Sequence, residues 1–416
     1  MQLKKKPVTG MKDILPREME IRDYVLSVMK DTYRRFGFVS IETPCVEHLE
    51  NLNSKQGGEN EKLIFKILKR GEKLKLEEAK EEADLVDGGL RYDLTVPLCR
   101  YYANHSAELS APFKALQTGN VWRADRPQRG RYRQFMQCDI DILGEASNMA
   151  EIELILATST FLGKIGFERF TIRINDRRIL KAMAAYSGFP QESYDTVFII
   201  LDKMDKIGIE GVAAELEKEG FAKDSIMKYL GLFGQIQPNA EGIAFLQKEL
   251  EGYLDAQVAQ GLSHIVKIVE KAKQSNFNLV FDPTLVRGMS YYTGPIFEIT
   301  MDDFGGSVGG GGRYDEMIGK FTGQNTPACG FSIGFERIVM LLLEHDFQIP
   351  KEKGKRAYLL DKKLSEEQVE ELMMKAMAER ADGMEISLNV MKKNKKFQKE
   401  QLEAEGYTEI VEIFAD

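Results

Sequence analysis

The sequence predicts an α+β fold: an antiparallel sheet flanked by helices, interrupted by a helical insertion and followed by a small α/β domain. Within residues 113–144, two runs of alternating apolar residues joined by a polar loop predict paired antiparallel strands. Between residues 171 and 265 the alternation gives way to amphipathic stretches separated by Gly and Pro, which predicts helices. After Pro350, strand-like and helix-like segments alternate, as is typical of a small α/β domain.

The N-terminal part begins with a predicted helix and a predicted strand. From Pro16, apolar residues recur at helical spacing as far as Gly37, which supplies a stop. The segment FVSIETP then alternates as a strand up to Pro44. Such a unit suits a hydrophobic core and a dimer interface equally well.

The polar loop between the two alternating runs is dense in arginine: Arg123, Arg126, Arg129, Arg131 and Arg133. Only Asp125 opposes them in sequence, and we expect the arginines to continue into the strands, where a half-buried charge needs a partner. Guanidinium groups this close repel one another unless an anion lies among them, and their geometry matches phosphate oxygens. A solvated basic hairpin tip is the simpler alternative, but we favour a phosphate-bearing ligand.

Two further places look like helix starts. Asp93 and Thr95 lie where a predicted strand gives way to a helix, in RYDLTVPLCRYYANH. An Asp at such a place is most often a helix cap. Asn148 with Glu151 resembles a second helix start, leading into an apolar helix of the core.

After the insertion the residue pattern again predicts strands. Arg287 precedes Tyr291 and Tyr292 in a predicted strand, and SVGGGGRYDEMIG contains four consecutive glycines. Such glycines bring the backbone close to a ligand or a packed strand, and the pattern is neither a P-loop nor GxGxxG. Arg337 falls in the first turn of a predicted helix, where the helix dipole disfavours a cation. We therefore expect either an anion or Glu336 to neutralise Arg337.

Composition excludes several classes of protein. The 416 residues allow two or three domains, and a net charge of -8 excludes a uniformly basic nucleic-acid coat while permitting a local basic patch. The four cysteines lie far apart with no CxxC spacing, which predicts reduced thiols in a cytoplasmic protein rather than a zinc site or disulfide framework. No apolar run approaches the ~20 residues of a membrane span, and the first residues lack the apolar core of a signal peptide.

Five segments together resemble the class II aminoacyl-tRNA synthetases and, within them, the histidyl-tRNA synthetase family. The helix and strand ending at Pro44 resemble class II motif 1, VWRADRPQRGRYRQF resembles motif 2, and GFSIGFER resembles motif 3. RGMSYYTG and GGGRYD resemble the two histidine-binding signatures of the family. The resemblance covers about residues 7–345, with all five segments in the family's order.

This resemblance implies an enzyme that activates histidine with ATP and Mg²⁺ to histidyl-adenylate and transfers the histidine to the 3' end of histidine tRNA. It assigns Arg123 to the ATP α-phosphate and the substrate carboxylate, Arg287 to the opposite side of the α-phosphate, and Arg337 to the γ-phosphate. No protein side chain is assigned to a metal. The resemblance further implies a homodimer with no membrane partner, and a loop that reaches the acceptor end of the tRNA through Arg126, Gln128 and Arg129.

The resemblance also implies how histidine is held. The α-amino group is assigned to Asp93, Thr95 and Gln137. The imidazole is assigned to Asp141 and Tyr292, with Tyr314 lining the same pocket.

Three positions and the last segment depart from the common family pattern. Ser290 stands where the family usually has Asp or Asn, and Asp125 and Asp141 stand where many members have Glu, as in the eukaryote-like branch. Residues 351–416 resemble the anticodon-binding α/β domain of the family but are shorter by roughly a strand and a helix.

The predicted division is a catalytic domain in two parts, residues 1–170 and 266–350, around a helical insertion at 171–265, followed by the shortened α/β domain at 351–416. Two alternatives remain open. One is the non-catalytic regulatory subunit of ATP phosphoribosyltransferase in histidine biosynthesis, and the other is a synthetase paralogue that adenylates a different substrate. The three arginines assigned to ATP, the RPQRGR loop and the presence of a C-terminal α/β domain favour the synthetase.

Overall fold

The computed structural model describes residues 3–53, 60–287, 291–302, 304–350 and 354–415. The chain divides into two compact units. One comprises Met1–Asp13 with Val25–Leu341, and the other comprises Ile14–Tyr24 with Leu342–Asp416.

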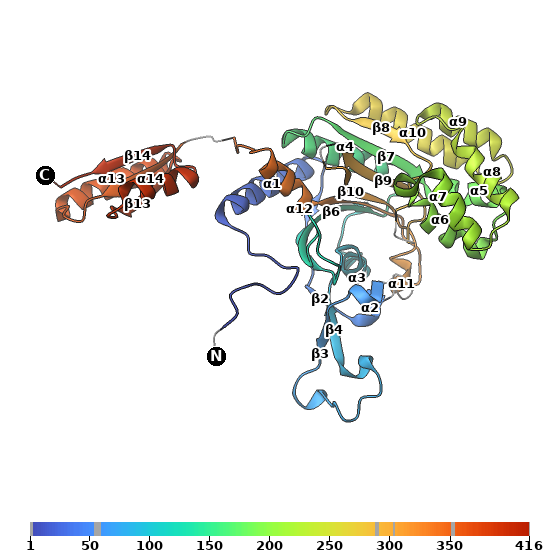
Figure 1. The fold of residues 1–416 in the computed structure, drawn as a ribbon, viewed down its shortest axis with the longest axis horizontal. Coiled ribbons are helices and arrows are strands. Elements are labelled where there is room, and N and C mark those ends of the chain that lie inside the picture. The colour runs from blue at the N-terminus through green and yellow to red at the C-terminus, as the bar shows by residue number, and fades with distance from the viewer. Residues whose placement is uncertain (1–2, 54–59, 288–290, 303, 351–353, 416) are drawn as a thin grey trace. The chain divides into compact units, whose positions relative to one another are not determined.

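The first unit is built on an eight-stranded sheet, seen near the centre of Figure 1. Its middle strands pair antiparallel, and only the outermost pairs, β1 with β5 and β7 with β8, are parallel. This confirms the predicted antiparallel sheet. In sheet order the strands are β1 (Val39–Ser40), β5 (Phe113–Trp122), β6 (Gln134–Leu143), β11 (Ala328–Gly334), β10 (Gly306–Arg313), β9 (Pro295–Met301), β7 (Phe170–Asp176) and β8 (Asn278–Phe281).

The longest pair of strands, β5 and β6, forms the predicted arginine hairpin. They remain in register from Phe113 opposite Leu143 to Trp122 opposite Gln134. The expectation that the arginines continue into the strands is wrong, because all five lie in the intervening loop at 123–133. The ladder ends at Trp122, so the guanidinium groups avoid the fully paired part of the sheet.

Helices flank this sheet (Figure 1): α1 (Pro16–Arg35), α3 (Thr95–His105), α4 (Met149–Lys164) and α12 (Phe335–Glu344). The first helix begins and stops where its sequence predicts, since Gly37 takes the left-handed conformation with φ 85°. The predicted strand up to Pro44 is much shorter than expected, because only Val39 and Ser40 pair with β5.

A small second sheet lies between α1 and α3 in the chain. It has the order β2-β4-β3, and all its pairings are antiparallel. Its elements are β2 (Val46–Glu47), α2 (Leu49–Asn53), η1 (Asn60–Leu63), β3 (Lys66–Leu68), η2 (Gly71–Lys73), η3 (Glu82–Leu85) and β4 (Val86–Leu90).

The predicted insertion is helical and lies between β7 and β8. Because β8 pairs parallel to β7, the helices form the crossover between these two strands. They gather at the β7–β8 end of the sheet in Figure 1. In chain order they are α5 (Arg177–Tyr186), η4 (Gln191–Ser193), α6 (Tyr194–Leu201), α7 (Met204–Lys218), α8 (Lys223–Phe233), α9 (Ala240–Glu249) and α10 (Ala256–Ala272).

A short helix, α11 (Gly319–Thr322), precedes β11. The second unit contains an α/β domain with a parallel three-stranded sheet of order β13-β12-β14, which confirms the predicted β/α alternation. Among the residues described, no helix is both long and apolar enough to cross a bilayer. The elements of this domain are β12 (Lys355–Leu360), α13 (Glu366–Ala381), β13 (Glu385–Val390), α14 (Lys395–Ala404) and β14 (Glu409–Ile413).

Candidate active site

A cavity of about 350 Å³ opens on the face of the central sheet, between β6, β10 and β11 and the arginine loop. Nine residues to which the resemblance assigns ATP or histidine all line this cavity. They come from segments nearly 250 residues apart in the chain. The nine are Asp93, Thr95, Arg123, Gln137, Asp141, Arg287, Tyr292, Tyr314 and Arg337.

One end of the cavity is rich in guanidinium groups. Burial lowers the pKa of Arg337, and the nearby charges of Arg131, Arg287 and Arg123 lower it further. A cation whose neighbours repel its charge favours binding an anion at that place. This end of the cavity is therefore suited to phosphate groups.

Arg337 lies in the first turn of α12, as its sequence predicts. Its guanidinium donates to the carbonyl oxygen of Ser307 and lies 5.4 Å from the centre of the Phe304 ring. Glu336, the alternative partner in the sequence analysis, accepts the backbone N–H of Met136 at 3.0 Å. We favour an anion as the explanation for a cation at a helix start.

Arg123 is fixed directly beyond the end of β5. Its Nε donates to the carbonyl of Tyr92 at 2.8 Å, and its Nη2 lies 3.4 Å from Oε1 of Gln137. The guanidinium also lies 5.2 Å from the centre of the Phe135 ring. These contacts hold the charge at the cavity wall without pairing it to a carboxylate in any of them.

Arg287 does not lie in a strand, contrary to expectation. It lies between β8 and β9 in the left-handed conformation, with φ 59°, and its Nη1 donates to Oε2 of Glu298 at 2.7 Å. Burial acts to lower the pKa of Arg287, but Tyr292 and Glu298 more than offset it, so the pKa is raised. Arg287 therefore remains charged at the cavity wall.

Asp93 serves as a helix cap and also reaches the cavity. Its Oδ1 accepts the backbone N–H of Val96 at 3.1 Å at the start of α3, and its side chain is 2% exposed. Thr95 is the first residue of α3. The helix start therefore places a carboxylate and a hydroxyl side by side at the cavity wall.

The other end of the cavity is made of tyrosines and a carboxylate. The hydroxyl of Tyr314 donates to Oδ1 of Asp141 at 2.5 Å, and both side chains are buried. Ring centres lie 4.6 Å apart for Tyr291 and Tyr292, and 6.2 Å apart for Tyr291 and Tyr314. Flat walls with one buried acceptor suit a small aromatic group that carries an N–H donor.

Glycines make room for this end. A Cβ on Gly330 would lie 2.0 Å from Oδ1 of Asp141, and a Cβ on Gly311 would lie 1.9 Å from the carbonyl oxygen of Gly330. The four-glycine run in β10 thus serves both of its predicted purposes, since it packs closely between β9 and β11 and lines the cavity.

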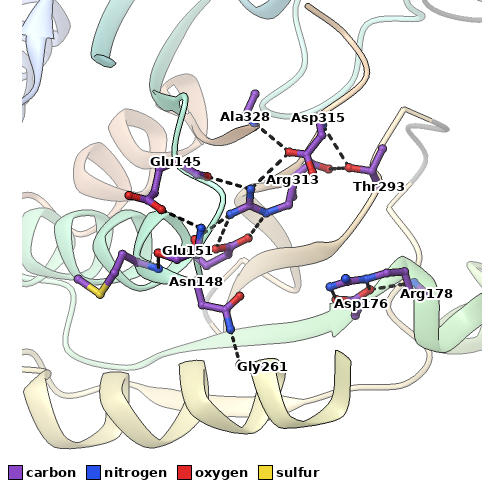
Figure 2. Close-up of polar contacts among 12 residues, drawn as sticks. Glu145, Asn148, Glu151, Asp176, Arg178, Gly261, Thr293, Arg313, Asp315 and Ala328 are labelled. Carbon is purple, nitrogen blue, oxygen red and sulfur yellow. Dashed lines mark hydrogen bonds and ion pairs between the residues drawn. The ribbon is translucent and has the colours of Figure 1, made fainter. Parts of the chain in front are cut away.

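The arginine that follows the glycines points away from the cavity. Figure 2 shows the guanidinium of Arg313 against Glu151, with contacts of 2.6 and 2.9 Å, and against Asp315 at 3.3 Å. Asp315 also accepts the backbone N–H of Ala328 at 2.9 Å. The GGGRYD signature therefore divides: its glycines and Tyr314 face the cavity, and Arg313 joins β10 to α4.

The predicted helix start at Asn148 is correct, but its side chain does not cap the helix. Helix α4 begins at Met149, with no cap bond from the Asn148 side chain, and Asn148 Nδ2 instead donates to the carbonyl of Gly261 in α10 at 3.0 Å (Figure 2).

The loop residues assigned to tRNA do not line the cavity. Arg126, Gln128 and Arg129 are exposed at a tight tip, where the backbones of Gln128 and Arg131 bond to each other at 2.9 and 3.1 Å. Asp125 pairs with Arg131 at 3.0 Å. Arg126 and Arg129 are thus exposed residues of a basic tip, which agrees with an external anionic partner and equally with a solvated tip.

Two residues of the cavity wall, Asp139 and Ser332, do not stand out in the sequence, and Tyr291 and Glu336 also line it without an expected ligand. Asp139 could have been found, because Gln137, Asp139 and Asp141 alternate along β6 and therefore share one face. Ser332 lies opposite Asp139 on β11, a pairing that the sequence does not show. Ser290 lies outside the described residues.

The structure also shows the state of the four cysteines and of possible metal-binding clusters. Cys99, Cys138 and Cys329 are buried and Cys45 is exposed, and none of the four is in a disulfide bond. Within the described ranges, no three His, Cys, Asp or Glu side chains gather in a way that could hold a metal ion.

Comparison with known proteins identifies the family. The family model described as histidyl-tRNA synthetase matches residues 10–338. The chain is 47% identical over 363 residues to the histidine–tRNA ligase of Leifsonia xyli subsp. xyli, a match that covers 85% of this chain and 83% of that protein.

Solved structures agree in fold. The histidyl-tRNA synthetase of Nostoc sp. PCC 7120 is similar at a TM-score of 0.80 and 26% identity, over 100% of this chain and 93% of that one. A Bacillus halodurans protein described as an ATP phosphoribosyltransferase regulatory subunit/histidyl-tRNA synthetase shares the fold at a TM-score of 0.79 and 20% identity, over 100% of both chains. With a family match over most of its length and a relative at 47% identity, the chain belongs to the histidyl-tRNA synthetase family.

Proposed function

We propose that this protein is a histidine–tRNA ligase, which activates histidine with ATP and transfers it to the 3' end of histidine tRNA. The observation that carries the proposal is a single cavity with guanidinium groups at one end and a tyrosine–carboxylate pocket at the other. The first end suits the phosphates of ATP and the second suits the imidazole of histidine.

In the first step, a carboxylate oxygen of histidine attacks the α-phosphorus of ATP. The bond from that phosphorus to the bridging oxygen breaks, and pyrophosphate leaves with the bond electrons. Arg123 and Arg287 would stabilise the charge that develops on the α-phosphate, while Arg337 would hold the γ-phosphate. Positioning and electrostatics suffice for this chemistry, so no side chain needs to act as a nucleophile.

Histidine would be held through both of its ends. Asp93, Thr95 and Gln137 would accept hydrogen bonds from its α-ammonium group through a carboxylate, a hydroxyl and an amide oxygen. Asp141 and Tyr292 would contact the imidazole, with Tyr314 fixing the Asp141 carboxylate at 2.5 Å. Mg²⁺ is expected to accompany the ATP phosphates and neutralise part of their charge, and we assign no side chain to it.

In the second step, a terminal ribose hydroxyl of the tRNA attacks the carbonyl carbon of the adenylate, and AMP leaves. Arg126, Gln128 and Arg129 would contact the acceptor end, because guanidinium groups at an exposed tip can reach phosphates. We further propose a cytoplasmic homodimer whose dimer contact involves the motif 1 segment. We also propose the four-part division at residues 170, 265 and 350, with an anticodon-binding role for residues 351–416.

The regulatory subunit of ATP phosphoribosyltransferase remains the second candidate, because a protein whose description includes that name shares the fold. A regulatory subunit has no need to stabilise a phosphoryl transition state. The placement of Arg123, Arg287 and Arg337 around one cavity therefore favours the ligase.

The proposal is tested by ATP–pyrophosphate exchange with each of the twenty amino acids, followed by charging of histidine tRNA. Exchange with histidine alone, followed by charging, supports the ligase. Exchange without charging favours a paralogue, and no exchange with any amino acid favours the regulatory subunit.

A further inference from the structure

Asp139 is a buried carboxylate on the cavity wall to which neither the family resemblance nor the reaction assigns a role. It lies on β6 between two residues assigned to histidine, Gln137 and Asp141, on the same face of the strand. Its side chain is 4% exposed. Burying a carboxylate is unfavourable unless hydrogen bonds compensate for the lost water, so the contacts of Asp139 are informative.

The contacts of Asp139 determine which way the amide of Gln137 points. Gln137 Nε2 donates to Asp139 Oδ2 at 3.2 Å and to Oγ of Ser332 at 3.1 Å, and the Ser332 hydroxyl donates to Asp139 Oδ1 at 2.5 Å. At the other end of the amide, Arg123 Nη2 donates to Gln137 Oε1 at 3.4 Å. An ionised carboxylate can only accept hydrogen bonds, so Nε2 must face Asp139 and Oε1 must face away from it.

We propose that Asp139 is a positioning residue, which fixes the Gln137 amide so that its oxygen accepts a hydrogen bond from the α-ammonium group of the amino acid. This inference rests on the proposed function, in which Gln137 binds that group. When Asp139 is protonated it can donate a hydrogen bond, so it no longer excludes the reversed amide, and only the 3.4 Å contact with Arg123 still favours the original orientation. Protonation would thus weaken the hold on the acceptor at the ammonium site.

Burial, neighbouring charges and hydrogen bonds together set the pH at which Asp139 is protonated. Burial raises the pKa of Asp139 to about 7, and Asp93 beside α3 contributes in the same direction. Ser332 on β11, Gln137 on β6 and Arg123 beyond β5 oppose the shift. Tyr33 of α1 also lies close enough to interact with Asp139 electrostatically.

The sign of the pH effect follows from this raised pKa. Below about pH 7 the carboxyl group is neutral and the amide is held by Arg123 alone, whereas above it the group is ionised and holds the amide as well. Histidine binding should therefore strengthen as the pH rises through about 7. The imidazole of free histidine titrates in the same range, so the test must cancel its contribution.

The test compares Asp139→Asn with the wild-type protein in histidine-dependent pyrophosphate exchange at pH 6 and pH 8. The ratio of the two KM values for histidine cancels the titration of the substrate. We expect this ratio to be about fivefold at pH 8, the loss of roughly one hydrogen bond, and close to one at pH 6. The KM for ATP should move much less than the KM for histidine. A ratio that is the same at both pH values would overturn the inference.

Two further variants separate positioning from a purely structural role. Ser332→Ala removes a donor that holds the pKa of Asp139 down, so the midpoint of the pH dependence should move upward. Adding Gln137→Glu to Asp139→Asn supplies a group that accepts in either orientation, so the histidine KM at pH 8 should recover toward the wild-type value. A double variant as weak as the single one, at equal thermal stability, would contradict the inference.

The same assay distinguishes failure of the proposed ligase function from failure of the role proposed for Asp139. A wild-type protein without histidine-dependent exchange at any pH would overturn the proposed function, and this inference with it. Exchange by the wild type together with a pH-independent ratio would overturn the role of Asp139 alone.

Discussion

Arg287 combines an unusual backbone conformation with a buried charge. A non-glycine residue in the left-handed region costs on the order of 1 kcal/mol, and it persists where the surrounding structure holds it. Here Glu298 fixes the guanidinium at 2.7 Å on the cavity wall. Such strain at a charged residue agrees with a role in the transition state rather than in folding.

Replacing Arg287 with Ala should therefore remove nearly all adenylate formation and leave the fold intact. We expect pyrophosphate exchange to fall by about 10²–10³-fold, the usual effect of removing one group that stabilises developing charge. Thermal unfolding serves as the control. Unchanged exchange in a folded Arg287→Ala protein would contradict the proposed mechanism.

Asp141 is the carboxylate of the tyrosine end of the cavity, and its removal should affect histidine more than ATP. In Asp141→Ala the KM for histidine should rise about tenfold or more, because a charged hydrogen-bond partner of the imidazole is lost. Tyr314→Phe keeps the carboxylate and removes only the hydroxyl that orients it at 2.5 Å, so its effect should be smaller. A histidine KM that did not move in Asp141→Ala would argue against this pocket.

At the scale of elements, adjoining residues of β10 contact two different parts of the molecule, the cavity and helix α4. Its glycines lie at the cavity, while Arg313 turns to Glu151 at the start of α4 (Figure 2). The Glu151 side chain is fully buried and that of Arg313 is 8% exposed. This ion pair therefore fixes the end of β10, directly before Tyr314, against α4.

Breaking this buried pair should cost stability rather than chemistry. Glu151→Ala leaves the Arg313 charge buried without its main partner, so the free energy of unfolding should fall by about 3–5 kcal/mol. Glu151→Gln retains the shape and an acceptor oxygen, and is expected to lose less. Denaturant unfolding measures both variants, and a Glu151→Ala protein as stable as the wild type would refute the structural assignment.

At the scale of the whole molecule, amino-acid activation and tRNA charging should be separable. The candidate active site lies in the first unit, whereas the three-stranded α/β domain is the last part of the second. A chain that stops after residue 350 should keep histidine-dependent pyrophosphate exchange. Its kcat/KM for tRNA should fall about tenfold or more, since each 1.4 kcal/mol of lost binding is a factor of ten. Charging as efficient as that of the full chain would contradict the anticodon-binding role.

The sequence was most informative where a local pattern sets the structure. The helix from Pro16, the long hairpin of β5 and β6, the helical insertion and the β/α alternation at the end all follow from spacing that each segment carries within itself. The motif segments likewise identified nine residues that line one cavity. The charge and hydrogen-bonding capacity of these nine residues depend on residue type, which is read directly from the sequence.

Tertiary structure alone decided what depends on contacts between distant segments. The sequence could not show that Arg313 turns away from the cavity to Glu151, because a neighbouring Tyr314 faces inward and both belong to one motif. Nor could it show that Ser332 lies opposite Asp139, since strand register between β6 and β11 is set by packing across the whole sheet. The residue types were determined by the sequence, and their partners by long-range packing.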